Sequence, residues 1–335
     1  MINLIVIGCT GLVGKSFVDL CEKIGNFENV KYYFGASENS IGREFYFNSE
    51  AYIIKSLEDI FQIISIDNKK SIFVNCSTNS VAREIYKFIK SQANENIILI
   101  DNSSEFRLDE DVRLIIPEIN FEFSETNIYS TPNCCTVMLA FLLNVFIKQK
   151  LQINSVNIST YQSASGAGLV GYNELLQQSI DFNHNTKLTT KFWNKQYIFN
   201  CFPHNSPIVN EEGYNEEEIK LILETQKIFK QNLNINPTCI RIPTLQSHCL
   251  NVVIEFEEQI LKNEIIDLIN NDDTLIFTHY PDALISNNSN FVFVGHIRKN
   301  LNNPKVYNFF ISGDQILRGS AVNAFDILQR LINRS

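Results

Sequence analysis

A chain of 335 residues exceeds what one hydrophobic core usually fills, so we expect two domains. Hydrophobic residues make up 44% of the chain and charged residues 19%, which is ordinary for a globular protein. The net charge of −9 argues against a nucleic-acid partner and an anionic membrane, because both call for a basic surface. No apolar run approaches the ~18 residues of a membrane span.

The N-terminal residues 1–8 lack the basic leader and the cleavage site of a signal peptide, so we expect them to form a first strand. The eight cysteines show no regular spacing, and Cys76, Cys201 and Cys239 lie inside apolar runs. Reduced cysteines fit that pattern better than a disulfide framework does. The sequence therefore predicts a cytoplasmic protein.

The first 130 residues alternate short apolar runs with segments of helical periodicity. We expect strands over residues 3–7, 31–36, 71–76, 96–101, 113–116 and 127–130. Residues 14–24 and 80–91 carry apolar side chains at helical spacing. Repeated strand–helix–strand units imply right-handed crossovers and a mostly parallel sheet.

The pattern changes after about residue 135. A helix expected over residues 137–148 is followed by strand-like runs over 155–162, 195–202, 238–243, 250–256, 291–297 and 306–312. Long strands with few intervening helices indicate an α+β domain with a large mixed, mostly antiparallel sheet. Residues 319–332 return to helical spacing.

Gly8, Gly11 and Gly14 form a G-x-x-G-x-x-G turn between the first strand and the first helix. Glycine at such a turn allows close approach of the backbone to a pyrophosphate and close packing of helix on strand. The helix N-terminus adds free N–H groups and the positive end of its dipole. In this context the turn predicts a Rossmann-like dinucleotide-binding domain.

The loop after the second strand, residues 36–43, should lie near the adenosine ribose. An acidic residue there favours NAD, whereas small or basic residues accommodate the 2′-phosphate of NADP. Ser37, Ser40 and Arg43 would hold a phosphate, and Glu38 would oppose one. The loop leaves both cofactors open.

Cys134 and Cys135 precede the apolar helix over residues 137–148. A thiolate at a helix N-terminus is stabilised by the dipole, which brings its pKa down from about 8.5 toward neutrality. Packing is the commoner role for one cysteine among eight, and only one of two neighbours can point into a site. The position at a helix start and a domain change favours a nucleophile.

Further polar residues lie at strand ends, and each has a plain structural alternative. Gln162 ends a strand in a small-residue turn, where it would otherwise be a surface amide. Arg241 and His248 lie seven residues apart, and a histidine in such a loop is more often structural or solvated. As isolated charges, three residues would be assigned to solvated surfaces: Arg107, Glu217 and Lys220.

Taken together, these stretches resemble the aspartate-β-semialdehyde dehydrogenase family over nearly the whole chain. The likeness is carried by residues 8–14, 100–107, 116–120, 132–136, 162–168, 241–248 and 319–323, in this order and spacing. The resemblance implies an NADP-binding domain over residues 1–133, completed by a C-terminal helix over 319–335. It implies a catalytic and dimerisation domain over residues 134–318.

The resemblance also implies a role for each matching residue. Cys134 would be the nucleophile and His248 the general acid/base, with Gln162 positioning the acyl carbonyl. Arg241 would bind the substrate α-carboxylate and Glu217 its α-ammonium. The phosphate would be held by Arg107, Asn133 and Lys220. The cofactor would be held by Gly8, Thr10, Gly11, Leu12, Val13, Gly14, Ala36, Ser37, Ser40, Ser77, Thr78, Ser165, Gly166 and Asn323, and no metal is expected.

The implied reaction is the NADPH-dependent reductive dephosphorylation of L-4-aspartyl phosphate to L-aspartate 4-semialdehyde through a Cys134 thioester. It serves the biosynthesis of lysine, threonine, methionine and diaminopimelate, in a homodimer or homotetramer. N-acetyl-γ-glutamyl-phosphate reductase is an alternative, although residues 132–136 lack its Gly-Cys-Tyr-Pro pattern. A catalytically silent dinucleotide-binding paralogue is another, although it would be expected to have lost at least one of Cys134, Gln162, Arg241 and His248.

The chain departs from the family pattern at several positions. Asn39, beside Glu38, stands where an arginine commonly contacts the 2′-phosphate, so NAD is not excluded as the cofactor. Cys135 replaces a small serine or threonine after the nucleophile, and Ser247 stands where a glycine often precedes the catalytic histidine. Neither change removes a catalytic group.

Overall fold

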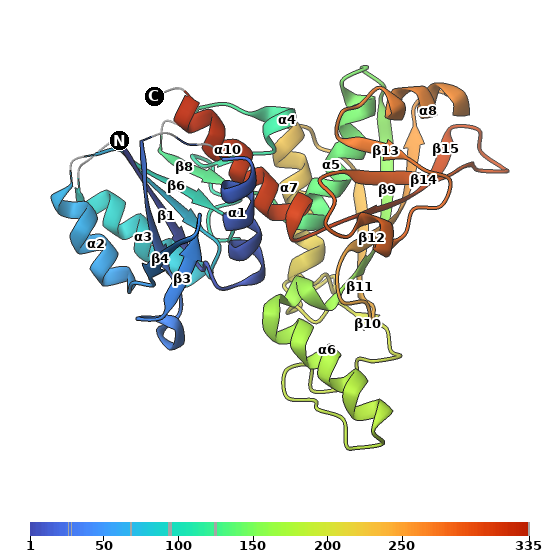
Figure 1. Ribbon diagram of the computed structural model, residues 1–335. Coiled ribbons are helices and arrows are strands. Elements are labelled where there is room, and N and C mark those ends of the chain that lie inside the picture. The colour runs from blue at the N-terminus through green and yellow to red at the C-terminus, as the bar shows by residue number, and fades with distance from the viewer. Residues whose placement is uncertain (26, 28, 68, 93–95, 124–125, 334–335) are drawn as a thin grey trace. The chain divides into compact units, whose positions relative to one another are not determined.

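The computed structural model describes residues 1–333 other than 26, 28, 68, 93–95 and 124–125. The chain divides into two compact units, Met1–Pro132 with Ser320–Ser335 and Asn133–Gly319. The last helix, α10 (Val322–Asn333), belongs to the first unit and follows a π-helical turn at Leu317–Ala321 (Figure 1). Residues 334–335 of the predicted C-terminal helix lie outside the described residues.

A six-stranded parallel sheet in the order β2-β1-β5-β6-β8-β7 forms the centre of the first unit. Its strands are β1 (Ile2–Ile7), β2 (Val30–Gly35), β5 (Ser71–Asn75), β6 (Ile97–Asp101), β7 (Arg113–Leu114) and β8 (Ile128–Ser130). β5 and β6 are buried at every position, as expected for strands covered on both faces. The predicted parallel sheet is confirmed, although the strand expected over residues 113–116 covers only its first two residues.

The helices of the first unit lie between these strands in the chain, except for α10 at the C-terminal end. They are α1 (Leu12–Lys23), α2 (Leu57–Ile66), α3 (Asn79–Gln92), α4 (Pro117–Asn120) and α10. Phe325 of α10 packs edge-on against Phe17 of α1, with the ring centroids 6.4 Å apart, so the C-terminal helix is part of this core. The sequence did not predict α2 or the hairpin of β3 (Glu44–Phe47) and β4 (Glu50–Ile53).

The glycine-rich turn joins β1 to α1 by very close backbone packing. Gly8 has a φ of +84°, which favours glycine, and a Cβ there would lie 2.6 Å from the Cys76 carbonyl oxygen. A Cβ on Gly14 would lie 2.1 Å from the Gly8 carbonyl oxygen. The helix therefore starts directly on the end of the strand, as the glycine spacing predicts.

A seven-stranded sheet in the order β10-β11-β9-β12-β15-β14-β13 forms the centre of the second unit. Its strands are β9 (Ile153–Gln162), β10 (Phe202–Pro203), β11 (Ile235–Arg241), β12 (His248–Phe256), β13 (Leu275–Phe277), β14 (Val292–Lys299) and β15 (Val306–Gly313). The β11–β9 and β13–β14 pairs are parallel and the other four pairs are antiparallel. The predicted mixed, mostly antiparallel sheet is confirmed.

The second unit contains more helix than we expected from its long strands. Its helices are α5 (Cys134–Ile147), α6 (Gly168–Asn183), α7 (Glu216–Phe229), α8 (Lys262–Asn270) and α9 (Ala283–Ser286). α5 is buried on nearly all sides, which explains its almost continuous apolar sequence. No helix within the described ranges is both long and apolar enough to cross a membrane.

The strand predicted over residues 195–202 is wrong, because only Phe202 of that run lies in a strand. Tyr197, Ile198 and Phe202 of this run are buried in a local cluster with Trp193, whereas Phe199 is exposed. The N–H groups of Tyr197 and Ile198 donate to the Gln178 side-chain oxygen, at 2.7 and 3.1 Å, instead of to a neighbouring strand. The apolar residues that predicted a strand here belong instead to a loop whose backbone N–H groups are hydrogen-bonded to the Gln178 side chain.

Replacing Gly14 by alanine tests the strand–helix junction. The added methyl group has no room against the Gly8 carbonyl, so α1 must shift away from β1. We expect a loss of about 1–3 kcal/mol of stability, measured from urea unfolding. Lys15→Ala, an exposed change at the next position of α1, should stay within about 0.5 kcal/mol of the parent chain. Equal stabilities of the two variants would contradict this account of the junction.

Candidate active site

Three neighbouring strands of the second unit bring polar side chains to one end of the sheet. β11 and β9 run parallel and place Arg241 opposite Gln162, the last residue of each strand. β12 runs antiparallel to β9 and pairs Cys249 with Tyr161, which puts His248 beside Gln162. Residues far apart in the sequence thus meet because the strands pair in this register. The structure brings together three of the predicted site residues here.

Cys134 is the first residue of α5, and Asn133 caps that helix. The Asn133 side-chain oxygen accepts hydrogen bonds from the N–H groups of Cys135 and Thr136, at 2.9 and 3.4 Å. Two otherwise unpaired donors of the first turn are satisfied in this way. A Cβ on Gly319 would lie 2.8 Å from the Cys134 Cβ, so the chain passes very close to this residue.

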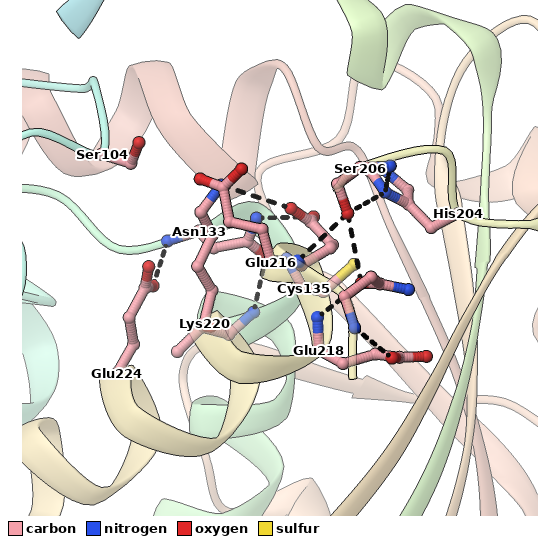
Figure 2. A network of polar contacts seen from close by, with 12 residues as sticks. Ser104, Asn133, Cys135, His204, Ser206, Glu216, Glu218, Lys220 and Glu224 are labelled. Carbon is pink, nitrogen blue, oxygen red and sulfur yellow. Dashed lines mark hydrogen bonds and ion pairs between the residues drawn. The ribbon is translucent and has the colours of Figure 1, made fainter. Parts of the chain in front are cut away.

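Two buried carboxylates of α7 hold Asn133 from the other side, and Figure 2 shows the contact of Asn133 with Glu224. Its backbone N–H donates to Glu224 at 2.6 Å, and its side-chain nitrogen donates to Glu217 at 2.8 Å. Gln162 also donates to the same Glu217 oxygen, at 3.3 Å. Every polar atom of the Asn133 side chain is therefore engaged in placing the start of α5.

Cys134, Cys135 and His248 form a compact group whose potential ligand atoms all lie within 4.8 Å of one another. A hydrogen bond with the Cys135 thiol, and then the interaction with His248, lower the pKa of Cys134 well below its ordinary value. Burial acts in the opposite direction but is outweighed. The lowered pKa favours the thiolate form of Cys134, which is the reactive form of cysteine.

Burial disfavours the thiolate form of other thiols in the chain. It raises the pKa of Cys9 to about 11 and the pKa values of Cys21 and Cys249 to about 12. Burial and the neighbouring Cys134 raise the pKa of Cys135 as well. The two adjacent thiols therefore divide their roles, with Cys135 as the hydrogen-bond donor and Cys134 as the candidate nucleophile.

The hydrogen bonds of His248 determine which ring nitrogen carries its proton. Nδ1 accepts from the Ser163 backbone N–H at 3.1 Å, and a backbone N–H can only donate. The proton of the neutral ring must then lie on Nε2, which is buried and makes no hydrogen bond to the described residues. A metal ligand would need a lone pair at that nitrogen, so His248 is better suited to transfer a proton than to bind a metal.

Charged side chains surround this end of the sheet. Arg241 is buried, donates to the Ser163 carbonyl at 3.1 Å and lies over the Trp193 ring, 5.6 Å from its centroid. Lys220 lies 2.9 Å from Glu216 and 3.8 Å from Glu217. Arg241 and Glu217 are buried and Lys220 is half-buried, so these charges do not lie on the solvated surface that their isolated positions suggested.

Glu217 keeps its charge although it is buried. Burial alone would raise its pKa, but His204, Lys220, the Asn133 hydrogen bond and Arg241 together lower it. Gly166 lies so close to two of these side chains that a Cβ there would lie 2.8 Å from an Arg241 terminal nitrogen and 3.0 Å from His248 Nε2. A small residue is therefore required at position 166.

His204 is a site residue that the sequence did not indicate. Burial, and then the charge of Arg241, lower the pKa of His204 to about 4. Its Nδ1 accepts from the Ser206 N–H at 3.2 Å, the same arrangement that His248 has with Ser163. Its sequence context, a polar loop after a short apolar run, carries no motif that would have revealed it.

The predicted dinucleotide residues belong mostly to the first unit. Gly11, the N-cap residue of α1, provides no side-chain cap, which leaves the first N–H groups of the helix available to a phosphate. Asn323 of α10 is fully buried, and neither its side-chain oxygen nor its nitrogen is hydrogen-bonded to the described residues. A buried amide without partners is rare and fits a binding surface for a polar ligand group.

The other predicted positions divide between the two units. Ser37 caps a 3₁₀ turn at Glu38–Ser40 after β2 and is exposed, as are Ser77 and Thr78 after β5. Arg107, also in the first unit, is buried and donates to the Asn102 carbonyl at 2.9 Å. Ser165 lies in the second unit with Gly166, where Gln315 donates to its hydroxyl.

Comparison with known proteins agrees with this arrangement. Residues 3–126 match semialdehyde dehydrogenase NAD-binding domains, and residues 143–318 match semialdehyde dehydrogenase dimerisation domains. Aspartate-semialdehyde dehydrogenase of Rickettsia bellii is 34% identical over 343 residues, which cover 98% of this chain and 97% of that protein. The Prochlorococcus marinus enzyme of the same name is 33% identical over 348 residues, which cover 100% of this chain and 97% of that protein.

A solved structure shows the same fold. The crystal structure of aspartate semialdehyde dehydrogenase II from Vibrio cholerae, complexed with ASA, superposes with a TM-score of 0.89 at 28% identity. It covers 99% of this chain and 98% of that one. The two domains and the cysteine site define a semialdehyde dehydrogenase, an oxidoreductase with a nicotinamide-dinucleotide domain. Within that class, the chain belongs to the aspartate-semialdehyde dehydrogenase family.

The thiol pair makes a prediction about pH. In the native chain, alkylation of Cys134 by iodoacetamide should have a midpoint well below the ~8.5 of a free cysteine. Cys135→Ala removes the hydrogen-bond donor, so the pKa of Cys134 should rise and the midpoint should move to higher pH. Peptide mass spectrometry distinguishes Cys134 from the exposed Cys201.

Cys21→Ala serves as the control, because that thiol is buried in α1. Its alkylation profile at Cys134 should match that of the native chain. A midpoint unchanged in Cys135→Ala would show that the neighbouring thiol does not stabilise the thiolate.

Proposed function

We propose that this chain catalyses the reductive dephosphorylation of L-4-aspartyl phosphate to L-aspartate 4-semialdehyde, in the biosynthesis of lysine, threonine, methionine and diaminopimelate. The observation that carries the proposal is the low-pKa thiol of Cys134 next to a proton-bearing His248, within a lining of buried charges. This constellation suits covalent capture of an acyl group from a small, charged substrate.

In the first step the Cys134 thiolate attacks the acyl carbon of the substrate, and inorganic phosphate leaves with the bonding electron pair of the acyl–oxygen bond. A thioester results. Gln162, buried beside Glu217 and His248, positions the acyl carbonyl. Covalent capture is necessary because a free carboxylate is a poor hydride acceptor, whereas a thioester is a good one.

In the second step the thioester carbon gains a hydride and becomes a hemithioacetal. The hemithioacetal then collapses to the aldehyde and returns the sulfur to Cys134 as a thiolate. His248 handles the proton at the substrate oxygen through Nε2, the nitrogen that the Ser163 N–H leaves protonated. The Ser163 backbone thus prepares the acid without contacting the substrate.

The charged lining is suited to aspartyl phosphate. Arg241 offers its guanidinium to the α-carboxylate, for which a planar donor pair is well matched, and Glu217 binds the α-ammonium. Lys220 would bind the phosphate, and the family resemblance assigns Arg107 to the same group. Asn133 was assigned to the phosphate by resemblance, but its engagement by Glu217 and by the α5 N–H groups supports a positioning role as well.

The reductant would be a nicotinamide dinucleotide, which supplies the hydride when bound. The uncapped start of α1 would hold its pyrophosphate, and the orphaned amide of Asn323 would bind a polar group of the same molecule. We propose NADPH as the physiological form, with Ser37 and Ser40 as donors to the 2′-phosphate. Glu38 in the same turn opposes that phosphate and keeps NADH as the competing form.

We further propose that the chain acts as a homodimer assembled through the second unit. The match of residues 143–318 to dimerisation domains supports this assembly.

Cys134→Ala should abolish turnover, by on the order of 10⁴-fold or more, because no other group supplies the nucleophile. Binding of the dinucleotide, followed by fluorescence titration, should survive the change. Cys135→Ala is the matched control and should retain activity, with a slower rate near pH 7 because its Cys134 is less ionised. A dead Cys135 variant beside an active Cys134 variant would overturn the assignment.

The native chain should reduce NADP when supplied with L-aspartate semialdehyde and phosphate, the oxidative direction of the reaction. Omitting phosphate should remove the activity, because nothing then releases the acyl group as acyl phosphate. We expect NADP to be used at least ~10-fold more efficiently than NAD, the equivalent of about 1.4 kcal/mol. Equal or greater efficiency with NAD would reassign the cofactor while leaving the reaction in place.

A further inference from the structure

Ser247, which directly precedes His248, has an unusual backbone conformation. Its φ is +64°, in the left-handed region that non-glycine residues rarely adopt, and its side chain is fully buried. Such a residue persists only when the surrounding structure holds it there. The contacts around Ser247 therefore indicate what keeps the chain in this shape at the start of β12.

The Ser247 hydroxyl makes one short hydrogen bond. It donates to the side-chain oxygen of Asn287 at 2.5 Å. Asn287 is the residue at which the short helix α9 ends, forty positions further along the chain. The bond thus joins the loop before His248, the candidate acid, to the loop after α9, which carries no predicted site residue.

A second connection runs parallel to the first. Gln246, immediately before Ser247, and the backbone N–H of Asn288, immediately after Asn287, both donate to one oxygen of Asp314, at 2.6 and 2.7 Å. Asp314 is completely buried and follows Gly313, the residue that pairs with His248 in the sheet. Its other oxygen accepts two backbone N–H groups, so Asp314 is a fixed anchor.

We propose that Asn287 is a positioning residue of the reaction: its side-chain oxygen holds Ser247 in the left-handed conformation that aims the His248 ring at Cys134. The inference rests on the proposed role of His248 as the acid. Asn287 touches neither the ring nor Cys134 in the hydrogen bonds described, so it acts through the backbone of Ser247.

The physical reason is that Ser247 and His248 share a peptide bond. Without the Asn287 bond, Ser247 relaxes toward an ordinary extended conformation, and that rotation turns the peptide plane and the Cα–Cβ direction of His248. The ring is then pulled from its bond with the Ser163 N–H and from the thiol group. A misplacement of about 1 Å at a catalytic group costs on the order of 100-fold in rate.

The first measurement is steady-state turnover of the full chain with L-aspartate semialdehyde, phosphate and NADP. Asn287→Ala and Ser247→Ala should each lower kcat by roughly 10- to 100-fold, with KM for the semialdehyde within about threefold of the native value. The double variant should be no slower than the slower single variant, because both changes break the same bond. Asn290→Ala, an exposed change in the same loop, is the matched control and should be unchanged.

The decisive comparison uses glycine. Ser247→Gly adopts the left-handed conformation without strain and needs no hydroxyl partner, so it should be close to native by itself. Combined with Asn287→Ala, it should restore kcat to within about threefold of native. Rates are expressed per reactive Cys134 thiol, counted by iodoacetamide, so that misfolded protein does not contribute. If Asn287→Ala does not fold, Ser247→Ala and Ser247→Gly carry the same comparison.

A second readout does not require turnover. Because His248 helps to lower the pKa of Cys134, a displaced ring should move the midpoint of Cys134 alkylation to higher pH in Asn287→Ala, and Ser247→Gly should reverse the shift. Full activity and an unshifted midpoint in Asn287→Ala would overturn the inference. So would a glycine double variant as slow as Asn287→Ala.

A different result would contradict the proposed function, namely a native chain that shows no turnover. The alkylation profiles of the variants would still decide whether Asn287 positions His248.

Discussion

The side chain of Asn133 carries the interaction on which the second unit's site depends. It closes the first turn of α5 with its oxygen and donates from its nitrogen to Glu217, while its backbone N–H binds Glu224. α5 and α7 are thereby joined at the point where Cys134 begins its helix. Since hydrogen bonds to buried carboxylates are stronger than neutral ones, this junction fixes the nucleophile more firmly than a helix cap alone would.

A second constraint is electrostatic. Buried charges are tolerated only when they are paired, and here Glu217, Lys220 and Arg241 compensate one another in a protein of net charge −9. The same groups that stabilise each other in the free protein are the ones that a zwitterionic, phosphorylated substrate would engage. Substrate binding then exchanges one set of ion pairs for another instead of uncovering isolated charges, which keeps its cost low.

The histidines show how much of the chemistry is set by backbone groups. The Ser163 N–H directs the proton of His248 to Nε2, and the Ser206 N–H does the same for His204. No side-chain pattern marks either serine as functional, because the working atom is a main-chain nitrogen. For the same reason Glu224 was not predicted: its partner is the backbone of Asn133, and its sequence context is an ordinary helix.

By itself, the sequence determined the parallel and mixed sheets and the glycine-rich junction, because periodicity and glycine spacing are local properties. Cys134, Gln162, Arg241 and His248 became candidates together only through the family resemblance. The sequence failed over residues 195–202, where the burial of Tyr197 is produced by a loop bonded to Gln178. Only the tertiary structure decided which of the two adjacent thiols has its pKa lowered and which ring nitrogen of His248 accepts from the backbone. Those outcomes depend on atoms that the strand register and the α5–α7 junction bring within a few ångströms, and sequence distance carries no information about them.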